Sequence, residues 1–486
     1  MIDTNDKRGL RPRTRATLAL AIMSLSIPAL ADTKTWVGGT STWNNAAAWL
    51  LPNQPQNGDQ VLITQDNAAV TYVSPANPSA VYSDFQVDSS GAGIATLNQA
   101  TETLNTNQLF VGVMGKGAVA QSGGALNVLN AAAGMSLGSS LGGNGNYTLS
   151  NSAILTVAGQ VVVGDVATGV LNQSGGRLIV TPLGSFPGQL VLASNVGSSG
   201  TYNLAGGSVE SGTLVLSPFG GNASFAHAAG SVTLTADLTL GDPTLPGFAG
   251  QAFYNHSGGA VSVQQLNIGS TGTFKQAGGT LRTTQLTINL TGGKLDVTDQ
   301  GMVIDYVIAT PLSTARSYIK SAYNGGNWSG SGITTSAANP AKAVAYAEAS
   351  ELLGLTGTNK ATWNGQTVDS TSLLIRYTLG GDANIDGVVD FTDLVKVAQN
   401  YGASGGTSTW LKGDFDYDGN IGFSDLVQVA QNYGTGLPAQ GVPGASVAFE
   451  NDLARAFASV PEPGALLLAG IAPCLLRRRK RRTVRV

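Results

Sequence analysis

The chain has 486 residues, of which 11% are charged, and its formal net charge is −3. Residues 1–31 carry five basic and two acidic residues, and residues 464–486 carry seven basic and no acidic ones. The rest of the chain holds 14 basic and 27 acidic residues, a net charge of −13, which excludes nucleic acid as a partner. Cys474 is the single cysteine, so no disulfide can form within one chain.

The N-terminus, residues 1–31, predicts an export signal. Five basic residues precede an apolar run at 16–27 and the small-residue sequence Pro28-Ala29-Leu30-Ala31. A basic region, a short apolar core and a cleavage site follow one another in the order of a secretory signal. A membrane span needs about 20 apolar residues, more than this run provides. We expect cleavage after Ala31.

Residues 32–114 are expected to form an N-terminal cap and the first β coils. Trp36, Trp43 and Trp49 precede a short apolar segment at 61–63. Two roles are open for the three tryptophans, which either cap the first coil or form a platform that binds sugars. We expect the capping role.

Residues 115–304 are glycine-rich and repetitive, and charged side chains are rare among them. A Gly-Gly phrase followed by a short alternating apolar segment recurs at Gly123-Gly124, Gly175-Gly176, Gly206-Gly207, Gly258-Gly259 and Gly278-Gly279. With degenerate copies included, the period is about 20–30 residues, which is typical of a solenoid. We therefore expect a right-handed parallel β-helix or a related β-solenoid. The pattern resembles the autotransporter-associated β-strand repeats of bacterial surface proteins.

Residues 305–380 differ in composition and are expected to form a small β-rich connector. An alanine-rich segment at 341–353, ending at Gly354, predicts a helix. The apolar segment 373–379 leads directly into the next motif. This region resembles the module that precedes dockerin-like repeats in planctomycete surface proteins.

Residues 381–434 contain one acidic pattern twice, beginning at Gly381 and again at Gly413. Oxygen donors stand at positions 1, 3, 5 and 12 of each loop, with Gly387 or Gly419 at position 6, a spacing that wraps the backbone around a hard cation such as Ca²⁺. The candidate ligands are Asp382, Asn384, Asp386, the Val388 carbonyl, Asp390 and Asp393 in the first loop, and Asp414, Asp416, Asp418, the Asn420 carbonyl and Asp425 in the second.

Each loop is followed by an apolar pattern of helical period that stops near Gly402 or Gly434. This duplicated stretch resembles the type I dockerin repeat. The resemblance implies an α-helical domain that holds two Ca²⁺ ions and docks onto a cohesin-like partner. Phe391-Thr392 and Phe423-Ser424 replace the small polar pairs that cohesin-reading dockerins carry. An internal clasp without any cohesin is the alternative.

Residues 435–459 are expected to form a flexible linker, and residues 460–486 a sorting signal. Pro461-Glu462-Pro463 precedes a short apolar stretch at 464–476 and a basic cluster at 477–482. This order resembles the PEP-CTERM signal of Gram-negative-type bacteria. The resemblance implies transient association of the tail with the inner membrane, recognition by an exosortase, and delivery to the envelope surface or the extracellular matrix.

Catalytic chemistry is not expected. The charged residues of the solenoid, Asp165 and Glu210 among them, are scattered, whereas acid–base catalysis needs paired groups. His227 and His256 stand just before or near Gly-Gly turns, at places equivalent to Gln or Tyr-type sites in other coils, and we expect them to face the turn. The sequence therefore predicts a non-catalytic, adhesin-like or structural surface protein that contacts polysaccharide or other proteins. The alternative is an extracellular carbohydrate-active enzyme recruited through its dockerin.

Overall fold

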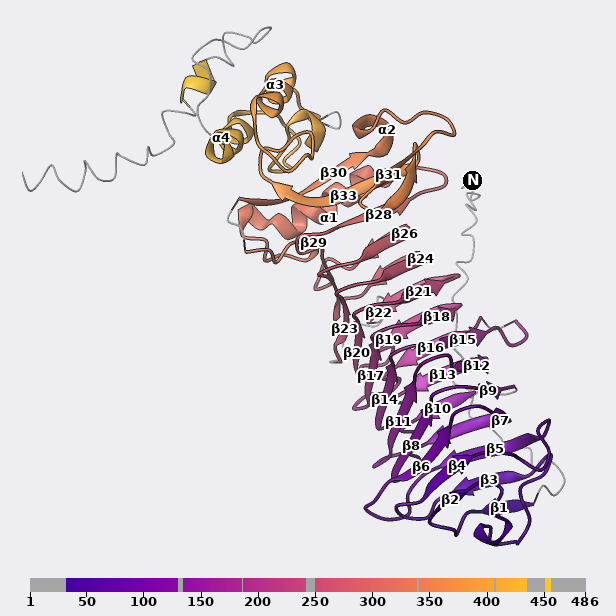
Figure 1. Cartoon of the computed structure of the whole chain (residues 1–486). Coiled ribbons are helices and arrows are strands. Elements are labelled where there is room, and N and C mark those ends of the chain that lie inside the picture. The colour runs from indigo at the N-terminus through magenta and orange to yellow at the C-terminus, as the bar shows by residue number, and fades with distance from the viewer. Residues whose placement is uncertain are drawn as a thin grey trace, which may run out of the picture.

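The computed structural model describes residues 32–434, apart from 130–133, 186, 242–249, 339–340 and 406–407, and also residues 451–455. The predicted export signal and sorting signal lie outside these residues. The chain is mainly β, with 44% strand and 13% helix, and contains a parallel β-solenoid of about 11 turns (Figure 1). The predicted β-solenoid is therefore confirmed.

One wall of the solenoid is a parallel sheet that gains one strand per turn. Its strands are β2 (Thr40–Thr42), β4 (Ala69–Tyr72), β6 (Ala95–Gln99), β8 (Lys116–Gln121), β11 (Asn144–Leu149), β14 (Thr168–Gln173), β17 (Ser199–Leu204), β20 (Asn222–His227), β23 (Ala252–His256), β25 (Gly272–Gln276), β27 (Lys294–Asp296) and β29 (Gly332–Thr334). We call it the 12-stranded sheet.

The other two walls belong to one bent sheet of 19 strands. Its parallel strands are β1 (Thr33–Thr35), β3 (Gln60–Ile63), β5 (Val81–Val87), β7 (Thr103–Val111), β9 (Ala125–Val128), β10 (Met135–Leu137), β12 (Ile154–Ala158), β13 (Gln160–Val163), β15 (Arg177–Thr181), β16 (Gln189–Leu192), β18 (Ser208–Ser211), β19 (Thr213–Leu216), β21 (Ser231–Leu234), β22 (Asp237–Leu240), β24 (Ala260–Ile268), β26 (Thr280–Ile288) and β28 (Gly301–Asp305). Antiparallel β30 (Lys342–Glu348) and β33 (Ser372–Leu379) complete it.

A typical coil consists of one strand from the 12-stranded sheet and two from the bent sheet, such as β14, β15 and β16. The sequence offset between paired residues of successive strands gives the length of a coil. Ala252 pairs with Gly272 in one of the shorter coils, and Thr168 pairs with Ser199 in one of the longer ones. These offsets agree closely with the period that the Gly-Gly phrases predict.

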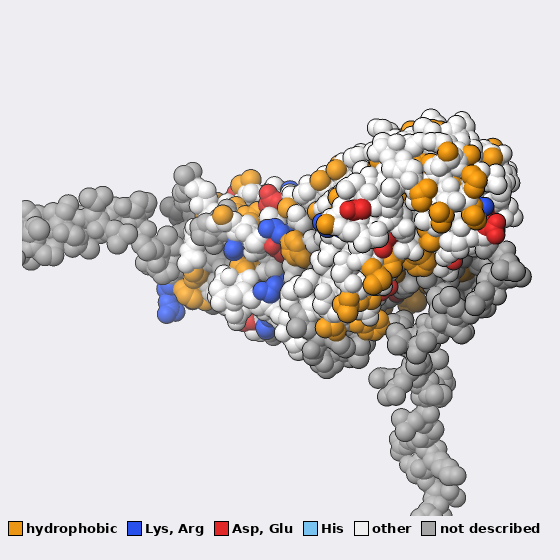
Figure 2. Space-filling model, turned by 90° about the horizontal axis from the view of Figure 1, so that it is seen from below, with side chains coloured by type: hydrophobic (Ala, Val, Ile, Leu, Met, Phe, Trp, Pro, Cys, Tyr) orange, Lys and Arg blue, Asp and Glu red, His pale blue; other side chains and the backbone are white. Residues whose placement is uncertain are grey.

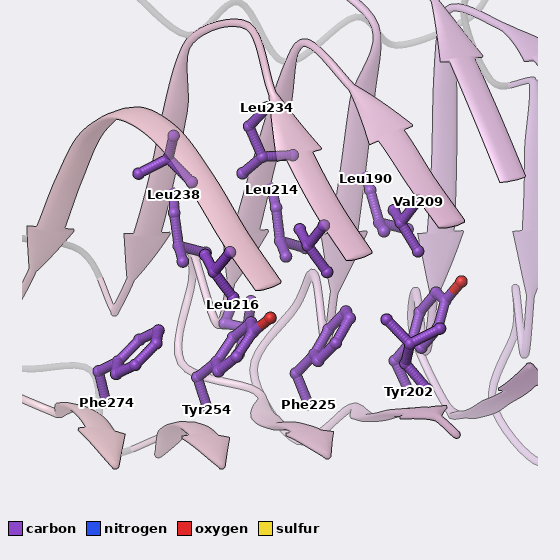
Figure 3. Packing of buried hydrophobic residues seen from close by; sticks show 14 of the residues in the cluster. Leu190, Tyr202, Val209, Leu214, Leu216, Phe225, Leu234, Leu238, Tyr254 and Phe274 are labelled. Atoms are coloured by element: carbon purple, nitrogen blue, oxygen red, sulfur yellow. The ribbon is translucent and has the colours of Figure 1, made fainter. Parts of the chain in front are cut away.

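The core consists of rows of inward side chains that repeat from coil to coil. Tyr202, Phe225, Tyr254 and Phe274 occupy one position in four successive strands, and their rings stack with centroids 4.6, 4.7 and 4.7 Å apart (Figure 3). This spacing equals the separation of neighbouring strands in a sheet, so in-register pairing brings each ring onto the next.

The Gly-Gly phrases form the corner at which the chain leaves the 12-stranded sheet. Gly176, the second glycine of its pair, has φ +66°, and a Cβ there would lie 2.2 Å from the Ala153 carbonyl oxygen of the preceding coil. The corner therefore requires both the left-handed backbone and the small side chain that glycine provides.

A buried row of Gln and His side chains, interrupted by Leu149 and Leu204, closes the same corner. Gln173 Nε2 donates to the Gly176 carbonyl at 3.2 Å, within its own corner, and to the Ser208 carbonyl at 3.1 Å, in the next coil. His227 and His256 occupy this row two and three coils later, and their rings stack with centroids 4.7 Å apart. The histidines thus take the corner position that glutamine holds in other coils; of the Gln and Tyr-type sites that the sequence left open, the structure selects the glutamine site.

The N-terminal end of the solenoid is closed by aromatic side chains. Trp36, Trp43 and Trp49 are no more than 2% exposed. The Trp49 ring lies 5.0 Å from Trp36 and 4.8 Å from Trp43 in edge-to-face contacts. The predicted capping role is confirmed, and burial excludes a sugar-binding platform made of these rings.

The C-terminal end is closed by residues that follow β28. β29 pairs with β27 as a further rung of the 12-stranded sheet, and β33 pairs with β28 and β30. The remaining elements here are α1 (Leu312–Tyr323), α2 (Ala349–Leu352), the hairpin β31 (Lys360–Trp363) and β32 (Gln366–Asp369), and the 3₁₀ turn η2 (Asn324–Gly326); η1 (Ala46–Ala48) belongs to the N-terminal cap. Helix α1 lies against β29 and β30.

The helix predicted at 341–353 is wrong for most of its length. Residues 342–348 form β30, and only Ala349–Leu352 are helical. The β30 strand is buried along both faces and pairs with β33 from end to end. This pairing outweighs the helix propensity of alanine, which is worth less than about 1 kcal/mol per residue.

Beyond the cap lie the helices α3 (Phe391–Asn400) and α4 (Phe423–Asn432) and the 3₁₀ turn η4 (Trp410–Lys412), and residues 451–455 are helical as well. Helices α3 and α4 each follow one of the acidic loops.

The aromatic row predicts that alanine substitutions at two phenylalanines lower the free energy of unfolding by unequal amounts. Phe225 points into the core and is fully buried, whereas Phe253 points outward from the neighbouring strand and is 37% exposed. Phe225→Ala should lower the free energy of unfolding by about 3–5 kcal/mol, and Phe253→Ala by less than about 1 kcal/mol. Denaturant unfolding measures both. Equal losses would contradict the inward and outward assignment.

The two histidines predict a loss of stability in acid. Burial lowers the pKa of His227 to about 4, and burial together with the neighbouring His227 lowers the pKa of His256 to about 4. The unfolded chain therefore takes up protons below about pH 6.5 that the folded chain refuses until about pH 4. Stability should be complete above pH 6.5 and fall between pH 6.5 and 4, by roughly 3 kcal/mol per histidine.

Thermal unfolding of the H227Q/H256Q variant tests this assignment, since glutamine fills the same row in other coils. The variant should lose much of the decrease in Tm between pH 6.5 and 4 and keep the Tm of pH 7.5 within a few degrees. An unchanged acid response would show that other groups cause it.

Candidate metal centre

The two acidic loops, residues 382–393 and 414–425, have the same unusual backbone. Position 4 is left-handed in both, with φ +58° at Ile385 and +60° at Tyr417. Position 6 is glycine with φ +92° at Gly387 and +96° at Gly419. A left-handed β-branched residue such as Ile385 costs about 1–3 kcal/mol, so the surrounding contacts of each loop must hold this conformation.

The loops are also held by reciprocal backbone pairing. Ile421, at position 8 of the second loop, bonds to the segment after α3: its N–H donates to the Ala403 carbonyl at 2.9 Å, and the Gly402 N–H donates to its carbonyl at 2.8 Å. Val389, at position 8 of the first loop, accepts from the Gly434 N–H after α4 at 3.4 Å. Each loop thus contacts the chain that leaves the other helix.

The buried carboxylates at position 12 hold each loop together through hydrogen bonds to its backbone N–H groups. Asp393 accepts from the Ala383 N–H at 2.8 Å and, with its other oxygen, from the Asp390 N–H at 2.8 Å. Asp425 accepts from the Phe415 N–H at 2.7 Å and the Gly422 N–H at 2.9 Å. Both side chains are fully buried. Asp393 Oδ1 accepts a second bond, from the Asn384 N–H at 3.2 Å, so Asp393 Oδ2 and both Asp425 oxygens are the ones that keep a lone pair for a cation.

The second loop brings three carboxylates together. Asp414, Asp416 and Asp418 each offer one oxygen within 4.8 Å of the other two. The Asn420 N–H donates to Asp418 at 2.6 Å, which fixes the turn after position 5. Three hard oxygen donors at this separation fit a Ca²⁺ ion, which takes oxygen ligands at about 2.3–2.6 Å.

The first loop gathers its donors through hydrogen bonds. Asp382 is fully buried and accepts from the N–H groups of Asp386 and Gly387 and from the Thr378 hydroxyl. Asn384 Nδ2 donates to Asp386 at 2.8 Å. The Val388 N–H donates to the same carboxylate at 2.8 Å.

Asp390, the candidate at position 9, accepts from the Thr392 N–H at 2.8 Å and is the N-cap of α3. One oxygen of Asp390 therefore caps the N-terminus of α3.

Burial perturbs the acids that lie inside the loops. It raises the pKa of Asp393 and of Asp414 to about 6 and that of Asp425 to about 7, and it raises the pKa of Asp382. Buried carboxylates gather here without enough positive charge to stabilise their ionised forms. A bound divalent cation would supply that charge.

The second loop packs directly on the end of the solenoid. Tyr417, at position 4 of the second loop, is fully buried; its hydroxyl donates to the Val344 carbonyl at 3.0 Å and accepts from the Val344 N–H at 3.3 Å. Its ring lies 5.2 Å from Tyr323 and 6.1 Å from Trp328. Sequence reasoning missed this contact, because no local pattern joins residue 417 to residue 344.

The acidic residues considered for catalysis are engaged in structural contacts. Asp165 accepts from Asn195 Nδ2 at 2.9 Å, one coil away. Glu210 forms an exposed ion pair with Arg177 at 2.8 Å. Two surface hollows, of about 300 and 580 Å³, lie near the two ends of the solenoid, one beside Arg282 and Lys360 and the other beside Lys34 and Asp59. Neither contains Asp165 or Glu210.

Comparisons with models of protein families, with curated proteins and with solved structures found no match. Of the helices in the described residues, none has both the length and the apolar character of a membrane span. The predicted sorting residues Pro461, Glu462 and Pro463 lie outside the described residues.

Proposed function

We propose that this chain is an exported, non-catalytic, adhesin-like structural protein whose solenoid contacts extracellular polysaccharide and whose C-terminal loops bind Ca²⁺. The observation that carries the proposal is the outer face of the 12-stranded sheet, on which uncharged amide and hydroxyl side chains predominate and a few apolar ones, such as Val170, Ala226 and Phe253, interrupt the rows. Thr148, Asn172 and Asn203 follow one another in one outward row, and Asn203 Nδ2 donates to Asn172 at 2.8 Å. Seen from below in Figure 2, uncharged and hydrophobic side chains cover most of the surface of the described residues, and acidic and basic ones are few.

This face suits an extended polymer. Because amide or hydroxyl side chains stand on the outer face of most coils, a polysaccharide lying along the stack meets such groups repeatedly. Many weak hydrogen bonds then add through multivalency. The scattering of acids across coils, described above, argues against the alternative of a polysaccharide-degrading enzyme.

We propose further that residues 381–434 form a dockerin-like module with two Ca²⁺ sites. The duplicated backbone, the converging oxygens of Asp414, Asp416 and Asp418, and the raised pKa values support this proposal. A cohesin-like domain is the proposed partner for the part of the module that does not contact the solenoid. The contacts of Tyr417 favour a second role as an internal clasp on the end of the solenoid.

Export through residues 1–31 and sorting of the tail by an exosortase belong to the same proposal. They place the mature protein on the envelope surface or in the matrix of a Gram-negative-type bacterium, where calcium is abundant.

Calcium binding predicts a stabilising effect that depends on position 5 of each loop. Asp386 and Asp418 are exposed, so D386N/D418N should fold normally without metal. Millimolar Ca²⁺ should raise the Tm of the exported chain, residues 32–459, and this rise should largely disappear in the double variant. Asp299→Asn, at an exposed aspartate outside the loops, is the control and should respond as wild type. An equal rise in all three proteins, or none in wild type, would contradict the two-site assignment.

Polysaccharide contact predicts retention without cleavage. Replacing Asn146, Asn172 and Asn203 by alanine should weaken co-sedimentation of the chain with polysaccharide several-fold, because it removes amides from one outer face. Replacing Asn105 and Asn127, a hydrogen-bonded pair on another wall, is the matched control. Release of reducing ends that is abolished by Asp165→Ala or Glu210→Ala would establish the enzyme alternative instead.

A further inference from the structure

A cationic side chain from the solenoid cap lies against the second loop. Arg316, on α1, places Nη2 2.7 Å from Asp414 Oδ2 and 3.3 Å from the Tyr417 carbonyl oxygen. A Cβ at Gly419 would lie 2.7 Å from the same nitrogen, so the guanidinium covers the turn of the loop. The Arg316 side chain is 19% exposed and that of Asp414 is fully buried.

Among the described residues, the first loop has no such basic side chain against it. The equivalent carboxylate, Asp382, accepts from the Thr378 hydroxyl and from backbone N–H groups. Within the described residues, no basic side chain lies within ion-pair distance of it. Each loop carries four aspartates, yet only the second receives a positive charge from elsewhere in the described part of the chain.

We propose that Arg316 is a built-in counter-ion of the second loop, which must be displaced before a divalent cation binds there, so that the two duplicated sites are unequal. This inference rests on the calcium proposal above. A guanidinium and a divalent cation repel each other, and both require the position 1 carboxylate. The first loop is then the stronger cation site, and the second binds a cation only as Arg316 leaves Asp414.

The geometry of the contact suits exchange. The 2.7 Å approach is an ion pair, but Asp414 Oδ2 has no hydrogen-bond partner of good alignment among the described residues. Charge attraction therefore contributes most of the contact with Asp414, and displacing the guanidinium also breaks the 3.3 Å hydrogen bond from Arg316 Nη2 to the Tyr417 carbonyl. Tyr417 holds the loop to the cap through Val344, independently of Arg316, so the module stays attached when the guanidinium moves.

Without metal, Arg316 has a stabilising role. It offsets part of the repulsion among Asp414, Asp416 and Asp418, whose charges no other described basic side chain meets within ion-pair distance. It thereby fastens the loop to α1. Calcium and Arg316 are alternative sources of positive charge for the same carboxylate, and removing Arg316 should weaken the metal-free state and strengthen calcium binding.

Calorimetric titration of the exported chain with CaCl₂ tests the inference with a matched pair of variants. Wild type should show two unequal sites. Arg316→Gln should raise the affinity of the weaker site by about tenfold, because the competing charge is gone. Lys320→Gln removes a charge from an exposed position on the same helix and should leave both affinities unchanged.

Thermal unfolding in excess EGTA gives a second readout. Arg316→Gln should lower the Tm by several degrees, and Ca²⁺ should restore it, whereas Lys320→Gln should match wild type. If Arg316→Gln changes neither calcium affinity, this inference is wrong, while the calcium proposal stands. The absence of binding heat from all three proteins would overturn both.

Discussion

The in-register parallel stacking of coils is the constraint on which the rest of this molecule depends. Each interior strand of the 12-stranded sheet pairs with its neighbours above and below, so whatever stands at one position in a coil lies directly on its counterpart. Rings then stack on rings, as in the row from Tyr202 to Phe274, and glycines follow glycines at the corners. The regular arrangement of the whole stack therefore follows from the in-register pairing of each coil with the next.

The same rule accounts for the distribution of charge. Like charges in register on adjacent strands repel, so a long stack favours uncharged polar side chains on its outer walls. Arg177 and Glu210, which lie diagonally on the neighbouring strands β15 and β18, are oppositely charged and form an ion pair. Dense acidic groups are gathered instead in the two loops beyond the solenoid, where backbone N–H groups and Arg316 meet them. The uncharged outer walls of the solenoid and the acidic loops therefore occupy different parts of the chain.

Sequence reasoning succeeds where the information is local and repeated. The Gly-Gly phrases, the coil length and the turn-facing position of His227 all follow from a periodic pattern, and the burial of Trp36 follows from its place at the start of it. It fails for β30, whose alanines favour a helix until β33 pairs with them. It also misses Arg316, which is distant from Asp414 in the sequence and approaches it only when α1 packs on the cap. The residue spacing of the loops predicts which oxygens could bind a cation, whereas the position of the Arg316 guanidinium depends on the tertiary fold.

Native-state hydrogen exchange across the 12-stranded sheet tests the central constraint most directly. Interior strands such as β14, β17 and β20 have a paired strand on each side, so their amides should exchange slowly and at similar rates. Faster exchange is expected only toward β2, the edge strand at the N-terminal end of the sheet. Fast exchange within the central strands, or protection confined to a few isolated coils, would contradict a continuous in-register stack.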